Sequence, residues 1–296
     1  MSNNQNNQNI DIEEKRRFIL QELNKLNIKQ LQNFENFTGP GLKRKILRLI
    51  FSFQIDLPYL LLKLGFNNNN KLSKRGFFTG YLRYLTYFND LKLSKFFIKN
   101  LKEDDVFYDI GANYGFYSYL ALEFCKEVHL FEPQPDLFKN LSENLREESD
   151  IFLNNVALSN KSGIESLLIA GGESSIVPEI KMELSKEFKK EIEVQTITLD
   201  DYIKVHNKPS VLKIDVEGAE DLVLEGGKEF FKNNSPIIAM EVWSNNKSNK
   251  NHKKAVNFLR DLGYSCYYIN NEGEISFISG LDYEIIKGID NFIFKK

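Results

Sequence analysis

The chain has 296 residues, of which 42% are hydrophobic and 27% charged, a composition typical of a globular protein long enough for one large domain. Its two cysteines are too few for a disulfide framework or a four-thiolate zinc site, and the polar start MSNNQNNQN does not resemble a secretory signal. No run reaches the roughly 18 apolar residues that a membrane-spanning helix needs, so we expect a cytoplasmic protein.

The first hundred residues are expected to form a tail and a helical extension of the main domain. Residues 1–9 are polar and Asn-rich, which is typical of a disordered segment. Residues 10–100 carry apolar side chains at three- and four-residue intervals, which predicts amphipathic helices. Much of this extension is basic: residues 41–100 hold 12 Lys or Arg side chains against two Asp, whereas the whole chain has a net charge of −2.

The basic extension admits two interpretations. Either its aromatic side chains pack on the rest of the protein while the Lys and Arg side chains stay in solvent, or residues 41–66 bind an anionic membrane surface. The stretch GLKRKILRLIFSF interleaves basic and apolar residues as an interfacial helix does, which would place the protein at the inner face of a membrane. Nucleic acid is not an expected partner, because the chain as a whole is slightly acidic and shows no known nucleic-acid-binding module.

From residue 101 to residue 296, short apolar runs alternate with longer helical patterns. This alternation predicts a doubly wound α/β domain with a mostly parallel sheet. The expected core strands cover residues 106–110, 127–131, 151–158, 211–216 and 237–242. The expected helices cover residues 115–124, 135–146, 220–231 and 252–262. Two antiparallel pairs are also expected, one inserted at residues 164–169 and 191–196 and one terminal at residues 264–269 and 292–294.

The segment DIGANYG follows the first expected strand, at the edge of the sheet where open α/β domains bind ligands. Gly111 and Gly115 permit a tight turn and a close approach of the backbone to a ligand. Because the loop runs into the amino terminus of a helix, its N–H groups suit a carboxylate or a phosphate. On its own this pattern is a weak signal, since similar glycine runs also form ordinary turns.

Two further strand ends strengthen the prediction of a nucleoside-like ligand. Glu132 ends the second strand about twenty residues after the glycine loop, where an acidic side chain can accept hydrogen bonds from both hydroxyls of a ribose. Asn155 and Ala157 end the third strand, where the edge of an adenine would lie. The three strand ends together predict a site for a ribose and its base.

The fourth strand and its exit, LKIDVEGAE, carry charges at alternate positions. Lys213, Asp215 and Glu217 are therefore expected on one face of the strand, and Glu241 near the end of the fifth strand could join them. Unpaired charge in a core strand costs several kcal/mol, so such a cluster is either paired for structure or functional. Its position beside Gly218 favours a function.

Together these motifs resemble the FkbM family of class I methyltransferases. The resemblance covers residues 105–242 through VFYDIGANYGFYS, HLFEPQPDLFKNL, NNVALSNKSG, LKIDVEGAEDLVLEG and IIAMEV. It implies a seven-stranded, Rossmann-like sheet that binds S-adenosylmethionine and methylates a hydroxyl group, often on a sugar or a polyketide. The implied cofactor loop comprises Asp109, Gly111, Asn113 and Gly115. Glu132 is the implied ribose acid, and Asp215 with Glu217 lines the implied transfer site.

Methyl transfer to a hydroxyl is helped by a base that takes the proton during attack, because an alcohol is a poor nucleophile. Asp215 or Glu217 is the expected base, and Lys213 would keep a carboxylate ionised and oriented.

Other residues have weaker claims to a role in the chemistry. His206 is a lesser candidate for the base, while His129 and His252 are expected to be structural. A divalent metal stays open as an alternative, because hard oxygen ligands gather at Asp215, Glu217 and Glu241.

Several alternatives in function also stay open. A nucleotide-dependent oxidoreductase shares the glycine loop and the ribose acid, but it expects GxGxxG where this chain has Asn113. A catalytically silent protein could keep the same fold, and transfer to nitrogen or nucleic acid lacks its usual Asn/Asp-Pro-Pro-aromatic signature here. The expected acceptor is a sugar hydroxyl in a cell-surface glycan or a lipid-linked sugar, with a small natural product or a lipid as the alternative. The oligomeric state is not determined.

Overall fold

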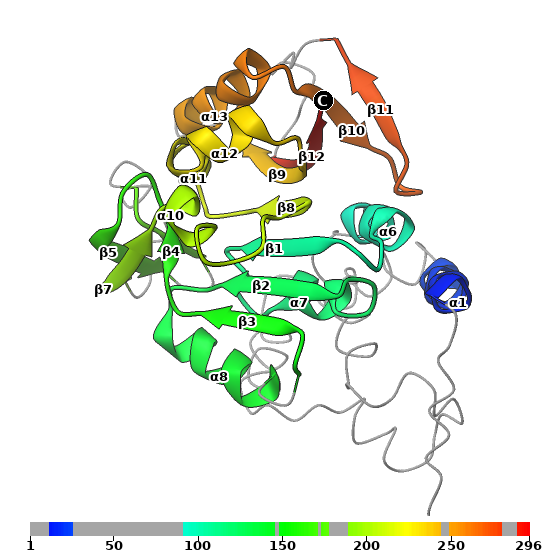
Figure 1. Ribbon diagram of the computed structural model, residues 1–296, viewed down its shortest axis with the longest axis horizontal. Coiled ribbons are helices and arrows are strands. Elements are labelled where there is room, and N and C mark those ends of the chain that lie inside the picture. The colour runs from blue at the N-terminus through cyan, green and yellow to red at the C-terminus, as the bar shows by residue number, and fades with distance from the viewer. Residues whose placement is uncertain are drawn as a thin grey trace, which may run out of the picture. The chain divides into compact units, whose positions relative to one another are not determined.

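The computed structural model describes most of the carboxyl-terminal two thirds of the chain and two helices before it (Figure 1). The described residues are 12–25, 91–145, 148–170, 173–177, 189–243, 249–279 and 289–296. The chain divides into two compact units, Met1–Lys99 and Asn100–Lys296. The predicted tail at residues 1–9 and the predicted membrane-binding stretch at residues 41–66 lie outside the described residues.

The described residues of the first unit are helical. They form α1 (Ile12–Lys25), which opens on two acidic residues, and most of α6 (Leu91–Asn100). α6 buries an apolar stripe that includes Leu93, Phe96 and Phe97, as an amphipathic helix does. Among the described residues, no helix is long and apolar enough to cross a membrane.

The second unit is built on a sheet of eight strands in the order β11-β10-β12-β9-β8-β1-β2-β3. These strands are β1 (Val106–Ile110), β2 (Glu127–Phe131), β3 (Ile151–Asn154), β8 (Val211–Ile214), β9 (Ile237–Trp243), β10 (Ser265–Ile269), β11 (Ile275–Ile278) and β12 (Ile289–Lys295). Strands β9, β8, β1, β2 and β3 run parallel, and β12, β10 and β11 form an antiparallel edge. The predicted doubly wound, mostly parallel sheet is confirmed.

The predicted number of seven strands is wrong, because the central sheet also contains β11. This strand pairs antiparallel with β10 through a tight turn at Asn270. The Asn270 side chain accepts hydrogen bonds from the backbone N–H groups of Glu272 and Glu274, and Gly273 takes a φ of 75°. A strand of four residues is too short to show a clear alternation in the sequence, so the prediction missed it.

Short helices connect the parallel strands. They are α7 (Phe116–Ala121), α8 (Pro135–Leu145), α10 (Leu199–Tyr202), α11 (Glu220–Gly226), α12 (Lys228–Asn233) and α13 (Asn249–Asp261). α7 and α8 contact the β1–β3 side of the sheet, and α13 contacts β9. Strands β1 and β8 are buried along their whole length, as expected when both faces of a parallel sheet are covered.

The predicted helix at residues 220–231 is interrupted at Gly227, where α11 ends and α12 begins. The glycine before it is required by packing. A Cβ on Gly226 would lie 2.1 Å from the Ser159 carbonyl oxygen, so only glycine allows this close contact.

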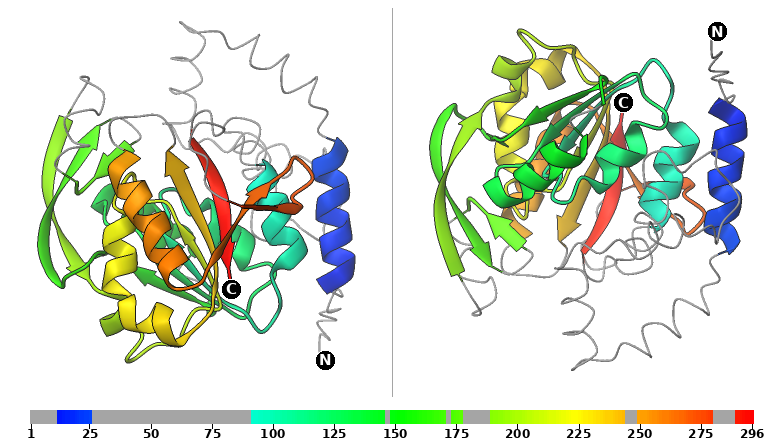
Figure 2. Two further views of the ribbon diagram at one scale, coloured as in Figure 1. Left: turned by 90° about the horizontal axis from the view of Figure 1, so that it is seen from above. Right: turned by 90° about the horizontal axis from the view of Figure 1, so that it is seen from below.

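A second sheet lies at one end of the central sheet (Figures 1 and 2). Its strands, in the order β4-β7-β5-β6, are β4 (Ala157–Leu158), β7 (Lys189–Ile197), β5 (Gly163–Ala170) and β6 (Glu173–Ser175). β5 and β7 are antiparallel, which confirms the predicted inserted pair. The predicted strand at residues 151–158 is wrong: its first half joins the central sheet as β3, and its second half pairs with β7 as β4. The break falls at Asn155, whose side chain bonds the loop after β2.

Candidate active site

The glycine loop after β1 is a left-handed turn at three positions. Gly111, Asn113 and Gly115 have φ values of 76°, 54° and 77°, a conformation that residues other than glycine and asparagine rarely adopt. A Cβ on Gly111 would lie 1.9 Å from the Asp215 carbonyl oxygen, so the loop can approach the end of β8 only with glycine here. The backbone geometry of the loop therefore favours glycine or asparagine at these three predicted positions, in agreement with the motif.

Asp109 anchors this loop from the end of β1. Its side chain is fully buried, and Ser118 donates a hydrogen bond of 2.7 Å to Oδ2. Burial raises the pKa of Asp109, and the nearby Lys213 ammonium and the Ser118 hydroxyl oppose that rise. Among the described residues, Oδ1 has no hydrogen-bond partner, although Lys213 Nζ lies 3.6 Å away.

Glu132 follows β2 and faces the glycine loop. Its Oε2 accepts a hydrogen bond of 2.7 Å from the backbone N–H of Asn113, and its Oε1 accepts one of 2.8 Å from Gln134. The side chain is only 3% exposed, and this burial raises its pKa to about 7 although both N–H groups favour the ionised form. The structure thus brings the predicted ribose acid to the predicted cofactor loop.

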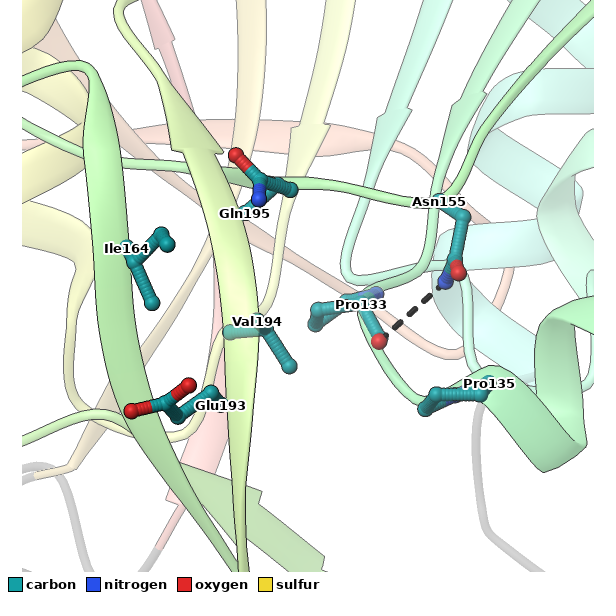
Figure 3. A pocket seen from close by; sticks show the side chains of 7 residues that line it. All are labelled: Pro133, Pro135, Asn155, Ile164, Glu193, Val194 and Gln195. Carbon is teal, nitrogen blue, oxygen red and sulfur yellow. Dashed lines mark hydrogen bonds between the residues drawn. The ribbon is translucent and has the colours of Figure 1, made fainter.

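The two residues predicted for an adenine edge have different surroundings. Asn155 donates through its amide to the carbonyl oxygens of Glu132 and Pro133, whereas Ala157 is buried in β4. Asn155 lines a hollow of about 250 Å³ between the loop after β2 and the second sheet. In Figure 3, Pro133, Pro135 and Asn155 face residues of β5 and β7 across this hollow, namely Ile164, Glu193, Val194 and Gln195. Ala157 does not line the hollow.

Lys213 connects the glycine loop with the end of β8. It pairs in register with Asp109 on the neighbouring strand, which brings two buried charges together. Its Nζ donates to the Gly111 carbonyl oxygen at 2.9 Å and lies 3.2 Å from Asp215 Oδ2. One buried ammonium therefore holds the two loops that the sequence assigned to cofactor and transfer.

The predicted common face of Lys213, Asp215 and Glu217 is only half right. Lys213 and Asp215 form an ion pair, but β8 ends at Ile214 and the strand alternation ends with it. Glu217 takes a φ of 53°, which belongs to a left-handed turn. Its carbonyl oxygen accepts a hydrogen bond of 2.9 Å from Ser175 of β6, so the second sheet holds this turn.

Behind this turn lies a polar cluster that the sequence did not predict as a unit. It comprises the buried Glu220, Trp243 and His252 and the half-buried Glu241. Trp243 donates to Glu241 Oε2 at 2.6 Å, and burial together with the nearby carboxylates raises the pKa of Glu241 well above its usual range. Burial also raises the pKa of Glu220 to about 8 and lowers that of His252 to about 4. The available sequence signal for this cluster was the position of Glu220, two residues after DVEG. Only the fold brings α13 beside Glu220.

The sequence also offered two lesser candidates, His206 as the base and a divalent metal at the carboxylates. His206 stacks on Tyr202 with ring centroids 4.1 Å apart and faces His129 at 5.4 Å, within an aromatic cluster on α10, β2 and β3. In the part of the chain that the structure describes, no group of three or more His, Cys, Asp or Glu side chains is arranged to hold a metal ion. Asp215, Glu217 and Glu241 therefore do not form a metal-binding group.

The sequence model of the methyltransferase FkbM domain matches residues 109–266, more than half of the chain. The chain belongs to the FkbM methyltransferase family. The match begins at Asp109 and includes the glycine loop, Glu132 and the whole exit of β8. The predicted family resemblance is confirmed.

Individual relatives match the chain with low identity or over only part of its length. The hexuronic acid methyltransferase AglP of Haloferax volcanii is 32% identical over 136 residues, which cover 44% of this chain and 52% of AglP. The chain thus spans about half the length of this curated relative. An FkbM methyltransferase structure from Methylobacillus flagellatus has a TM-score of 0.46 at 14% identity, covering 75% of this chain and 54% of that one. Fibrillarin from Aeropyrum pernix has a TM-score of 0.40 at 14% identity, covering 69% and 74%.

Proposed function

We propose that the chain is an S-adenosylmethionine-dependent O-methyltransferase that acts on a hydroxyl group of a sugar, most simply in a cell-surface glycan or glycolipid. The observation that carries this proposal is the buried Lys213, whose ammonium bonds the glycine loop at Gly111 and pairs with Asp215. A cofactor site and a transfer site held by one side chain have a fixed separation. Methyl transfer needs a fixed separation between the two sites, because the donor and acceptor atoms must be aligned.

The residues of the glycine loop fit S-adenosylmethionine. Glu132 offers a carboxylate that can accept hydrogen bonds from two ribose hydroxyls, in exchange for its present bonds to backbone N–H groups. Asn113 Oδ1 is buried without a hydrogen-bond partner among the described residues, so it is available to a donor on the ligand. The hollow beside Asn155 would take the adenine end.

We assign Asp215 as the general base. When bound, S-adenosylmethionine supplies an electrophilic methyl group on a sulfonium. Asp215 is 30% exposed at its side chain, so it can reach an acceptor hydroxyl, and the Lys213 ammonium orients its carboxylate. The Asp215 carboxylate would take the hydroxyl proton as the acceptor oxygen attacks the methyl group that the cofactor supplies. Glu217 would bind neighbouring acceptor hydroxyls.

A sugar is the proposed acceptor because carboxylates gather at the transfer end. Repulsion from Asp215 and Glu217 contributes to the raised pKa of Glu241, so the three groups lie near one another, and carboxyl oxygens are good acceptors for the several hydroxyls of a sugar. The name of AglP, a hexuronic acid methyltransferase, supports the same substrate class. A small natural product or a lipid is the alternative acceptor. The proposed docking of residues 41–66 on an anionic membrane would bring the protein to a lipid-linked sugar.

The test is a transfer assay with the full chain and S-adenosylmethionine labelled at its methyl group. The acceptors are cell-envelope glycans, lipid-linked sugars and a small-molecule extract, each incubated with the wild type and with Asp215→Asn. We expect label in a glycan or lipid-linked fraction with the wild type and a large loss with the variant. Label in the small-molecule extract alone would select the alternative acceptor, and binding of a nicotinamide dinucleotide in place of S-adenosylhomocysteine would overturn the cofactor assignment.

A further inference from the structure

The backbone of the loop after β8 takes an unusual shape at the proposed transfer site. Glu217 and Gly218 have φ values of 53° and 92°, two left-handed residues in succession. A glutamate rarely adopts this conformation without help from its surroundings, so neighbouring groups must hold it. The direction of the Glu217 side chain depends on this turn.

Glu220 holds the turn from the first residue of α11. Its Oε1 accepts hydrogen bonds from the backbone N–H groups of Val216, at 3.0 Å, and Gly218, at 3.3 Å, so it bonds on both sides of Glu217. The Glu220 side chain is fully buried, which keeps water from competing for these two N–H groups.

Two other elements bond the carbonyl groups of the same turn. Ser175 of β6 donates to the Glu217 carbonyl oxygen at 2.9 Å, and Asn251 of α13 donates to the Gly218 carbonyl oxygen at 3.0 Å. The turn is therefore fixed by side chains from three separate elements. Of these three, Glu220 is the one that bonds two N–H groups.

The other carboxyl oxygen of Glu220 lies beside α13. The Nδ1 atom of the fully buried His252 lies 3.4 Å from Glu220 Oε2 and 3.2 Å from the Glu241 carbonyl oxygen. The indole of Trp243, the single tryptophan of the chain, lies against the His252 ring with centroids 4.9 Å apart. We therefore expect a substitution of Glu220 to change the fluorescence emission of Trp243.

We propose that Glu220 is a positioning residue for methyl transfer: it holds the turn that presents Glu217 to the acceptor, without touching the acceptor itself. This inference rests on the proposed function. The simpler interpretation is a structural cap at the start of α11, which would affect folding but would not separate cofactor binding from transfer. The two interpretations differ in which quantity a substitution changes.

The test compares Glu220→Ala with Glu220→Gln in the full chain. The glutamine keeps an oxygen that can accept both N–H groups, whereas the alanine removes it. Asp200→Ala is the matched control, because Asp200 likewise accepts two backbone N–H groups at a helix start, those of Glu229 at 3.0 Å and Phe230 at 2.9 Å, on a different loop. For each protein we would measure the thermal midpoint, the affinity for S-adenosylhomocysteine, and labelled-methyl transfer to the glycan fraction.

We expect Glu220→Ala to lower the maximal transfer rate by about 30-fold or more, while the affinity for S-adenosylhomocysteine changes by less than about threefold. Glu220→Gln should restore the rate to within about fivefold of the wild type, and Asp200→Ala should lower the thermal midpoint without changing the rate. Equal losses of rate and affinity in Glu220→Ala, or a rate like that of the wild type, would overturn the proposal.

A measurement that needs no acceptor separates this proposal from the proposed function. Hydrogen exchange of the Val216 and Gly218 amides, together with Trp243 emission, reports whether Glu220 holds the turn. If the wild type binds S-adenosylhomocysteine but labels no fraction, the proposed function fails. Even then, unchanged exchange in Glu220→Ala would overturn the positioning role, while fast exchange that Glu220→Gln reverses would support it.

Discussion

The glycine loop after β1 and the turn after β8 face each other, but they are stabilised in different ways. The glycine loop owes its shape to the backbone: Gly111 and Gly115 take positive φ values and have no room for a side chain. The turn after β8 owes its shape to side chains from α11, β6 and α13 that bond the backbone around Glu217. The shape of the glycine loop is encoded by a short motif, whereas the shape of the turn after β8 depends on residues from distant parts of the chain.

Lys213 is the link between the two regions, so its removal should have the largest effect. Lys213→Met would leave Asp109 fully buried beside a neutral side chain and leave Asp215 without its ion pair. We expect a loss of about 3–5 kcal/mol in the free energy of unfolding, because one partner of a buried pair remains uncompensated. Denaturant unfolding measures this loss, and the transfer assay should show no activity in the folded variant.

A variant with the stability of the wild type would contradict this account of Lys213. Lys232→Met is a matched control, because Lys232 pairs with Glu229 at 2.8 Å on the exposed surface of α12. Exposed pairs contribute little, so this change should cost less than about 1 kcal/mol.

Gly111→Ala tests the backbone region alone. The new Cβ would lie 1.9 Å from the Asp215 carbonyl oxygen at a φ of 76°, so the loop must shift away from β8. We expect the affinity for S-adenosylhomocysteine to fall by about 100-fold, because the backbone N–H groups leave their positions. Titration calorimetry measures the affinity. Gly263→Ala is the control, since Gly263 has a φ of 86° but nothing within 4 Å of a new Cβ.

The carboxyl group of Glu132 should make cofactor binding depend on pH. Burial raises its pKa from 4.5 to about 7 in the folded protein. Because the folded pKa is raised, this group favours folding most below pH 4.5 and loses that contribution as the pH rises through about 7. Binding to ribose hydroxyls has the opposite preference, since the ionised carboxylate is the better acceptor.

We therefore expect the affinity for S-adenosylhomocysteine to rise by up to about tenfold between pH 6 and pH 8 in the wild type, as Glu132 ionises. Glu132→Gln should bind more weakly and show a flat pH profile over this range. Calorimetry at both pH values gives the comparison. The same slope in both proteins would show that another group titrates.

The smallest effect is expected outside both regions. Thr198 caps α10, and its hydroxyl accepts a hydrogen bond of 3.0 Å from the Asp201 N–H. Thr198→Ala should cost about 1 kcal/mol in the free energy of unfolding, as the loss of an N-cap usually does. The affinity for S-adenosylhomocysteine should not change, and a measurable decrease would mean that the binding loops are less independent of α10 than the structure indicates.

The sequence predicted the positions of the residues around the glycine loop well. Asp109 lies near the end of β1, and Gly111, Asn113 and Glu132 follow β1 and β2. The apolar runs of these strands are clear, so the places of the four residues at the carboxyl edge could be inferred from the sequence. It predicted the positions of the residues after β8 less well. β8 ends at Ile214, and the left-handed turn at Glu217, with a φ of 53°, ends the strand alternation from which a common face was inferred.

Strand counting failed where pairing is not local. Residues 151–158 contain one apolar run, but Asn155 divides it between two sheets because its side chain bonds the loop after β2. Likewise, nothing in the run of residues 275–278 states that it will extend the central sheet by one strand. When tertiary packing decides which strands pair, the sequence of a short strand indicates little about its partner.

The sequence by itself determined the family, the order of the motifs along the chain and the glycine loop. These features depend on local backbone freedom and on the period of the apolar residues. Only the tertiary structure decided that Lys213 joins Asp109, Gly111 and Asp215, and that Glu220 lies between the turn after β8 and His252. Buried charges are tolerated only where partners from other elements meet them, and which partners meet is a property of the folded chain.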